Sequence, residues 1–251
     1  MIEIIETKEG LEALKASLKE RGNMDSGEAA LTAKEIVNRV KNEGDAALFE
    51  YTRKFDCPDM DASKVKVSME EMKAAFDGLE PDLQKAMKLS ASRIEAFHEK
   101  QKQNTWIDVK ENGEILGQRV MPLEKAGVYV PGGKAAYPSS VLMNVIPAKV
   151  AGVKQIVMTT PANKEGKLSQ EVLAAAYIAG VTEVYKVGGA QAIAALAFGT
   201  ESIPKVDKIV GPGNIYVALA KREVFGYVSI DSIAGPSEIL VVADESANPT
   251  Y

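Results

Sequence analysis

Between Gly127 and Asp244 the chain repeats one pattern four times, in which a turn rich in glycine or proline adjoins short apolar runs. The four segments read AGVYVPGG, KVGGAQAIAALA, KIVGPGNIYVALAK and SIAGPSEILVVAD. Helical stretches of small residues follow the second and third turns. Glycines at such turns let backbone N–H groups approach a phosphate or a nucleotide closely. Four turns of this kind in strand–helix order favour an α/β nucleotide-binding region.

The bulk composition is that of an ordinary globular protein. The 251 residues are 46% hydrophobic and 26% charged, which suffices for one large domain or two smaller ones. A net charge of −5 gives no support for nucleic-acid binding, which usually needs a basic face. No apolar run reaches the roughly 18 residues that span a bilayer, and the acidic N-terminus lacks a secretion signal. The single cysteine, Cys57, suits a reducing compartment, so we expect a cytoplasmic protein with no nucleic-acid and no membrane partner.

The first half of the chain has helical periodicity. Apolar residues recur at helical spacing, and Ser68 with Glu71 forms a capping box at the start of one helix. Residues 105–122 alternate in polarity around an Asn-Gly pair, which predicts a β-hairpin in which Trp106 is partly buried. Helices are predicted over residues 9–21, 30–44, 45–55, 72–79 and 81–101.

The second half alternates strands, turns and helices. Strands are predicted over Gly127–Val130, Gln155–Thr159, Glu183–Val187, Lys208–Val210, Tyr227–Ser229 and Ile239–Ala243. Helices are predicted near Ser139–Val150, Ser169–Ala179, Ala190–Phe198 and Asn214–Arg222. Strands that are apolar on consecutive positions are typical of a parallel sheet covered by helices on both faces. The predicted fold class is therefore α/β with parallel strands.

Three of the turns carry polar side chains that could contact a ligand. Tyr129 and Lys134 flank a turn that either binds a ligand or only ends a strand. Residues Gly188–Gln191 open a helix whose free N–H groups attract an anionic group, and Gln191 can both donate and accept. Asn214 follows the next turn, where capping of a helix and contact with a ligand explain it equally well.

Other polar residues are weaker candidates for a functional site. Ser237 enters an apolar strand, where burial is costly without a partner, and a ligand is one possible partner. His98 is predicted to be a surface histidine, because no second histidine or carboxylate stands at a useful spacing. Acidic residues, Asp56 among them, surround Cys57 and disfavour a thiolate, so this cysteine is not expected to be a nucleophile.

The last residues carry a signal for the start of a helix. Asn248 is a good N-cap and Pro249 a good first helical residue, but only two residues follow them. The strand predicted before them would then lack its covering helix. We therefore expect the chain to be a truncated part of a longer protein.

These segments together resemble one known family. GVYVPGG, GGAQAIAALAFGT, KIVGPGNIYVALAK and IDSIAGPSEILVVAD are similar to signature segments of the histidinol dehydrogenases. The likeness runs through essentially the whole chain, and GPGNIYVALAK followed by DSIAGPSE is specific to that family. The resemblance implies a cytoplasmic, zinc-dependent homodimer. Such an enzyme oxidises L-histidinol to L-histidine through an aldehyde with two molecules of NAD, as the last step of histidine biosynthesis.

The resemblance also implies positions for the site and the domains. The NAD-contacting positions map onto Tyr129, Gln191 and Asn214, and a substrate-contacting serine maps onto Ser237. The implied fold has two incomplete Rossmann-like domains with parallel sheets, in an aldehyde dehydrogenase-like arrangement after a helical N-terminal part. The implied division is residues 1–24 as an N-terminal helical segment, 25–126 as the first part of domain one, 127–236 as the NAD-binding domain, and 237–251 as a strand returning to domain one.

The catalytic groups of the family are expected outside this sequence. The family's zinc ligands and its glutamate–histidine base pair follow the EILVVAD segment, so the resemblance implies no metal site, no catalytic residue and no turnover for the 251 residues alone. Two alternatives stay open. A non-catalytic dinucleotide-binding or assembly module would bind NAD without metal. An aldehyde-dehydrogenase-like acyl reductase would need a reactive cysteine, for which Cys57 is the sole candidate.

Overall fold

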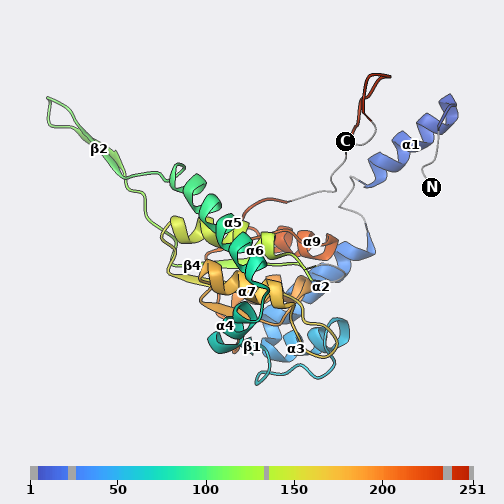
Figure 1. Ribbon diagram of the computed structural model, residues 1–251, viewed down its shortest axis with the longest axis horizontal. Helices are drawn as coiled ribbons and strands as arrows, with labels where there is room; N and C mark the ends of the chain where they lie inside the picture. The colour runs from blue at the N-terminus through green and yellow to red at the C-terminus, as the bar shows by residue number, and fades with distance from the viewer. Residues whose placement is uncertain (1–4, 22–26, 133–135, 234–238, 249–251) are drawn as a thin grey trace. The chain divides into compact units, whose positions relative to one another are not determined.

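The computed structural model describes residues 5–21, 27–132, 136–233 and 239–248 (Figure 1). The chain divides into two compact units, which we describe separately: Glu28–Ile233, and a smaller unit made of Met1–Gly27 with Ala234–Tyr251. In the described residues, no helix is long and apolar enough to cross a membrane.

The larger unit is built on a sheet of six strands in the order β1-β6-β5-β4-β7-β8. Five of them run parallel, and β1 closes one edge by antiparallel pairing with β6. The first parallel strand in chain order, β4, lies in the middle, with the next two on one side and the last two on the other. The strands are β1 (Lys66–Val67), β4 (Lys125–Tyr129), β5 (Gln155–Thr159), β6 (Glu183–Tyr185), β7 (Lys208–Val210) and β8 (Ser229–Ile230).

Helices cover both faces of this sheet because successive side chains of each strand point to opposite faces. Tyr129 of β4 packs into a core shared with α2, α3, α8 and α9. Its neighbour Val128 packs into a second core shared with α4, α5, α6 and α7. The helices are α2 (Glu28–Glu43), α3 (Asp45–Phe55), α4 (Met69–Asp77), α5 (Pro81–Glu99), α6 (Pro138–Val150), α7 (Gln170–Ala179), α8 (Gly189–Phe198) and α9 (Ile215–Val224).

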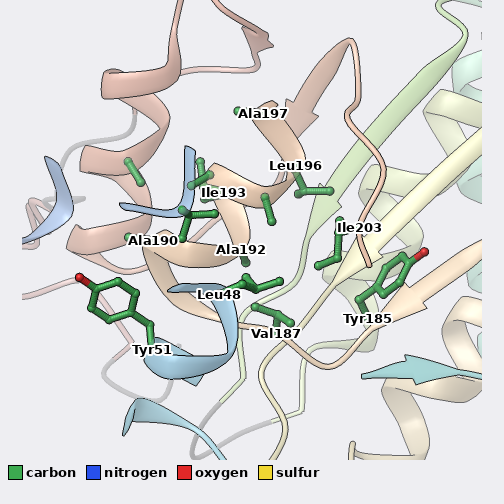
Figure 2. Packing of buried hydrophobic residues seen from close by; sticks show 14 of the residues in the cluster. Leu48, Tyr51, Tyr185, Val187, Ala190, Ala192, Ile193, Leu196, Ala197 and Ile203 are labelled. Carbon is green, nitrogen blue, oxygen red and sulfur yellow. The ribbon is translucent and has the colours of Figure 1, made fainter. Parts of the chain in front are cut away.

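The first of these cores forms around α8, whose alanines allow close packing. Ala190, Ala192, Ala194, Ala195 and Ala197 are all at most 1% exposed. Figure 2 shows Leu48 of α3 beside Ala192 of α8 and Val187. The predicted domain boundary after residue 126 lies within this compact unit, because α2 and α3 pack against α8 and α9 and β1 joins the sheet through β6.

Local sequence signals placed several elements correctly. The strands β5 and β7 have the predicted bounds, and the other predicted strands and helices of the larger unit differ mainly at their ends. The short edge strand β1 was not predicted. The serine half of the predicted capping box is confirmed, since the Ser68 hydroxyl accepts a hydrogen bond from the Glu71 N–H at 3.1 Å. The predicted hairpin is formed by β2 (Trp106–Val109) and β3 (Ile115–Gln118), beyond the end of α5 (Figure 1).

Two expectations of burial were wrong. Trp106 is 52% exposed, because all four side chains of each hairpin strand lie at the surface of the larger unit. The segment Ile239–Ala243 forms no strand within the described residues, and its side chains from Ile239 to Val242 are 79–88% exposed. An extended apolar segment becomes a buried strand only when another strand accepts its backbone hydrogen bonds. The rest of the smaller unit includes α1 (Lys8–Arg21), which is close to the helix predicted there.

Candidate functional site

A pocket of about 1010 Å³ opens at the carboxyl ends of the parallel strands of the larger unit. Its walls include segments that follow β4, β5, β6 and β7, with parts of α2 and the end of α3 completing them. The carboxyl edge of a parallel sheet is where α/β folds bind ligands, and the volume is at the upper end for a cofactor site. The pocket is lined by Thr32, Ile36, Phe55, Asp56, Tyr129, Pro131, Gly132, Ala136, Thr160, Pro161, Ala162, Asn163, Lys164, Lys167, Leu168, Ser169, Val172, Gly189, Ala190, Gln191, Asn214 and Tyr216.

Tyr129 enters the pocket from the last position of β4. The residue is 3% exposed, and its hydroxyl oxygen accepts a hydrogen bond from the Gly189 N–H at 3.2 Å. Burial raises the pKa of this hydroxyl to about 12. Tyr129 therefore keeps its proton at neutral pH, and the hydroxyl can donate to a ligand.

Gln191 lies in the first turn of α8 and is 1% exposed. Its Nε2 donates to Oδ2 of Asp56 at 3.4 Å. Its Oε1 is buried and has no hydrogen-bond partner within the described part of the chain. An unpaired buried acceptor costs about 1–3 kcal/mol, so a ligand that donates a hydrogen bond to this oxygen would recover that free energy.

Asp56 is the main residue that sequence reasoning missed. It caps the C-terminus of α3 and lines the pocket, where Oδ2 also accepts a hydrogen bond from the Gly188 N–H at 3.3 Å. Burial raises the pKa of this carboxyl to about 6. Its partners lie more than 130 residues further along the chain, so no local spacing signals the contact.

The N-terminus of α8 differs from the site expected from sequence. That helix start was predicted to attract an anionic ligand through its free N–H groups. In the structure the Gly188 N–H donates to Asp56 and the Gly189 N–H donates to Tyr129. Two of the N–H groups at the start of α8 thus donate to side chains of the chain itself, and one of these side chains is a carboxylate.

Asn214 follows β7 and is the N-cap of α9. Its Oδ1 accepts a hydrogen bond from the Val217 N–H at 3.1 Å and caps α9. The residue also lines the pocket, so its amide nitrogen is near any ligand bound there. The predicted residues Tyr129, Gln191 and Asn214, from three separate segments, therefore meet at one pocket.

An ion pair between a buried lysine and a partly exposed aspartate braces the turn before Asn214. Lys221 of α9, 4% exposed, pairs with Asp231 and donates to the Gly211 carbonyl oxygen at 3.0 Å. Asp231 accepts from the Gly211 N–H at 2.8 Å. Gly211 has φ +114, and a Cβ there would collide with the carbonyl oxygen of Tyr129. The turn thus depends on glycine and on both charged residues.

The remaining candidate residues lie away from the pocket or fall outside the residues that the structure describes. Ser237 and Lys134 fall outside the described residues. His98 is on α5, away from the pocket lining, and its Nδ1 is 2.7 Å from Oε1 of Gln101. Cys57 is 3% exposed and does not line the pocket, which gives no support to a cysteine nucleophile there. In the described ranges, no three His, Cys, Asp or Glu side chains gather as a metal site.

Comparisons with known proteins agree on one family. The family model for histidinol dehydrogenase matches residues 19–251. The histidinol dehydrogenase of Clostridium acetobutylicum is 56% identical over 235 residues, 94% of this chain and 54% of that protein. That of Geobacillus kaustophilus is 57% identical over 241 residues, 95% of this chain and 56% of that protein.

A solved structure supports the same assignment. The crystal structure of histidinol dehydrogenase from Elizabethkingia anophelis superposes with a TM-score of 0.81 at 41% identity. The match covers 92% of this chain and 55% of that one. The chain therefore spans about half the length of the curated relatives that it matches.

Proposed function

Because this chain belongs to the histidinol dehydrogenase family, we propose that its pocket binds NAD for the oxidation of L-histidinol to L-histidine. The observation that carries the proposal is the convergence of Tyr129, Gln191 and Asn214 on one pocket at the carboxyl edge of a parallel sheet. The unpaired Oε1 of Gln191 adds a buried acceptor that a ligand would satisfy. The reaction consists of two oxidations, from alcohol to aldehyde and from hydrated aldehyde to acid.

When bound, NAD would supply the hydride acceptor for each oxidation, one molecule for each. The residues of this chain hold and orient it. Tyr129 offers a hydroxyl donor, Gln191 an acceptor, and Asn214 an amide group next to its capping oxygen. Gly132 also lines the pocket, at a position where a Cβ would collide with Pro161. Ser237 is proposed to contact the substrate.

Zinc does not fit the part of the chain that the structure describes. The sequence has one histidine, and the described His, Cys, Asp and Glu side chains form no cluster of three. We therefore derive no step through a metal. We propose that zinc serves the whole protein with ligands beyond residue 251, and that the 251 residues alone do not turn over histidinol.

The finer architecture is also a proposal. The order β6-β5-β4-β7-β8, with the first strand central and the order reversing beside it, supports a Rossmann-like sheet. An aldehyde dehydrogenase-like pairing of two incomplete domains, over residues 25–126 and 127–236, stays a proposal, since residues 28–233 form one compact unit. A homodimer in the cytoplasm is likewise proposed for the whole protein.

Calorimetric titration with NAD tests the site. Asn214→Ser keeps an N-cap for α9 but removes the amide, so we expect NAD affinity to fall about tenfold with little change in melting temperature. Asn104→Ser, on an exposed residue outside the pocket, is the matched control. Unchanged affinity in Asn214→Ser, or no binding of NAD by the parent chain, would contradict the proposal. NADH production from histidinol, NAD and zinc by the 251 residues would contradict the proposed lack of turnover.

A further inference from the structure

We propose that Asp56 is a positioning residue for the dinucleotide, because it holds the side-chain amide of Gln191 in the orientation that leaves Oε1 available to the ligand. The inference rests on the proposed function and adds to it a residue that acts through Gln191. It also assigns a role to Asp56, a residue that the resemblance did not single out.

Gln191 depends on a neighbour for the orientation of its amide. The donor and acceptor ends of an amide have almost the same shape, so packing alone does not choose between the two orientations. Nε2 donates to Oδ2 of Asp56 at 3.4 Å, and an ionised carboxylate can only accept. The reversed amide would set Oε1 against Oδ2, one acceptor facing another. The observed orientation leaves Oε1 without a partner among the described residues, so it can accept a hydrogen bond from a ligand.

A glycine provides the space for this amide. A Cβ on Gly189 would lie 2.6 Å from Oε1 of Gln191 and 3.3 Å from Nε2. Gly189 has φ +63, and its N–H donates to the Tyr129 hydroxyl. Gly189 and Gln191 both line the pocket. The amide therefore lies against the backbone at the start of α8, and Asp56 is the hydrogen-bond partner of its donor end.

The end of α3 fixes Asp56 in turn. Its backbone N–H donates to the Thr52 carbonyl oxygen at 2.9 Å, and α3 packs against α8. Oδ2 of Asp56 also accepts from the N–H of Gly188, the N-cap of α8, at 3.3 Å. One oxygen thus connects the end of α3 both to the start of α8 and to the side chain of Gln191.

This geometry makes a specific demand on residue 56, which must supply an acceptor oxygen and need not supply a charge. The carbonyl oxygen of an asparagine can take the position of Oδ2. The Gly188 N–H would select that orientation, because the reversed one sets a donor against a donor. Asp56→Asn should therefore keep Gln191 in place, and Asp56→Ala should release it. An acid that bound the ligand through its charge would lose affinity in both variants.

Calorimetric titration with NAD tests the inference. We expect Asp56→Ala to lower the affinity about tenfold and Asp56→Asn to stay within about threefold of the parent. Gln191→Ala should also weaken binding, and adding Asp56→Ala to it should lower the affinity by less than about threefold more, because the two residues act as a unit. Asp59→Ala removes an exposed acid outside the pocket and should bind NAD as the parent does.

The outcomes separate the two proposals. A tenfold loss in Asp56→Asn, or equal losses from Asp56→Ala with and without Gln191, would overturn the inference and leave the proposed function intact. Unchanged affinity in Asp56→Ala would do the same. A parent chain that binds no NAD would refute the proposed function and the inference with it. If Asp56→Ala does not fold, Asp56→Leu has the shape of aspartate without its hydrogen bonds and replaces it in both measurements.

Discussion

Replacing Asp56 by asparagine should make the protein more stable at neutral pH, because the carboxylate is held in an unfavourable place. Burial raises the pKa of Asp56 from 3.8 to about 6. The folded state therefore keeps this proton to a higher pH than the unfolded chain does. The contribution of Asp56 to the free energy of unfolding is therefore fully present below about pH 4 and is lost as the pH rises through about 6.

The size of the effect follows from the two pKa values. The difference of about two units corresponds to about 3 kcal/mol above pH 7, of which about 2 kcal/mol is lost between pH 4.5 and pH 8. These are upper limits, since Asp56 is only half-buried. Urea unfolding followed by far-ultraviolet circular dichroism should show the stability difference between Asp56→Asn and the parent growing by up to this amount over that range.

The control and the refuting result use the same titration. Asp59→Asn removes an exposed acid close by in the sequence and should track the parent at every pH. A stability difference for Asp56→Asn that stays constant from about pH 4.5 to pH 8, or that shrinks, would show that burial does not raise the pKa of Asp56. A destabilising carboxylate in a pocket is understandable if it serves binding.

Two further predictions concern the turn that precedes Asn214. Gly211→Ala should lower the free energy of unfolding, measured in urea, by at least about 3 kcal/mol. The control Gly226→Ala has a similar φ of +100 but open space around it, so it should lower this free energy by only about 1–2 kcal/mol. Equal losses would show that the collision with Tyr129 is not what requires glycine at position 211. Lys221→Met removes the ion pair with Asp231, whose side chain is 32% exposed, and the hydrogen bond to the Gly211 carbonyl oxygen, so we expect a loss of about 1–2 kcal/mol and weaker NAD binding. A loss below about 0.5 kcal/mol in the same urea unfolding assay would contradict the brace.

The sequence predicted features that depend on residues close together in the chain, and it missed contacts between residues far apart in the chain. The bounds of β5 and the cap at Asn214 depend on residues within a few positions, so local patterns sufficed. Asp56 escaped notice because its contacts with Gly188 and Gln191 bridge 132 and 135 residues. Residues that share a carboxyl edge can be predicted once strands are placed, but an acid delivered from a distant helix cannot.

The errors on burial have a related cause. An apolar pattern indicates that a segment can be buried, but burial needs a second surface. Trp106 in the hairpin and the segment Ile239–Val242 meet no such surface among the described residues, and they are exposed. The pattern was correct for the hairpin's pairing and wrong for its packing.

A crystal structure of the chain with NAD tests the central claim most directly. The account predicts electron density for the dinucleotide in the pocket lined by Tyr129, Gln191 and Asn214. Density for the dinucleotide elsewhere on the molecule would contradict it.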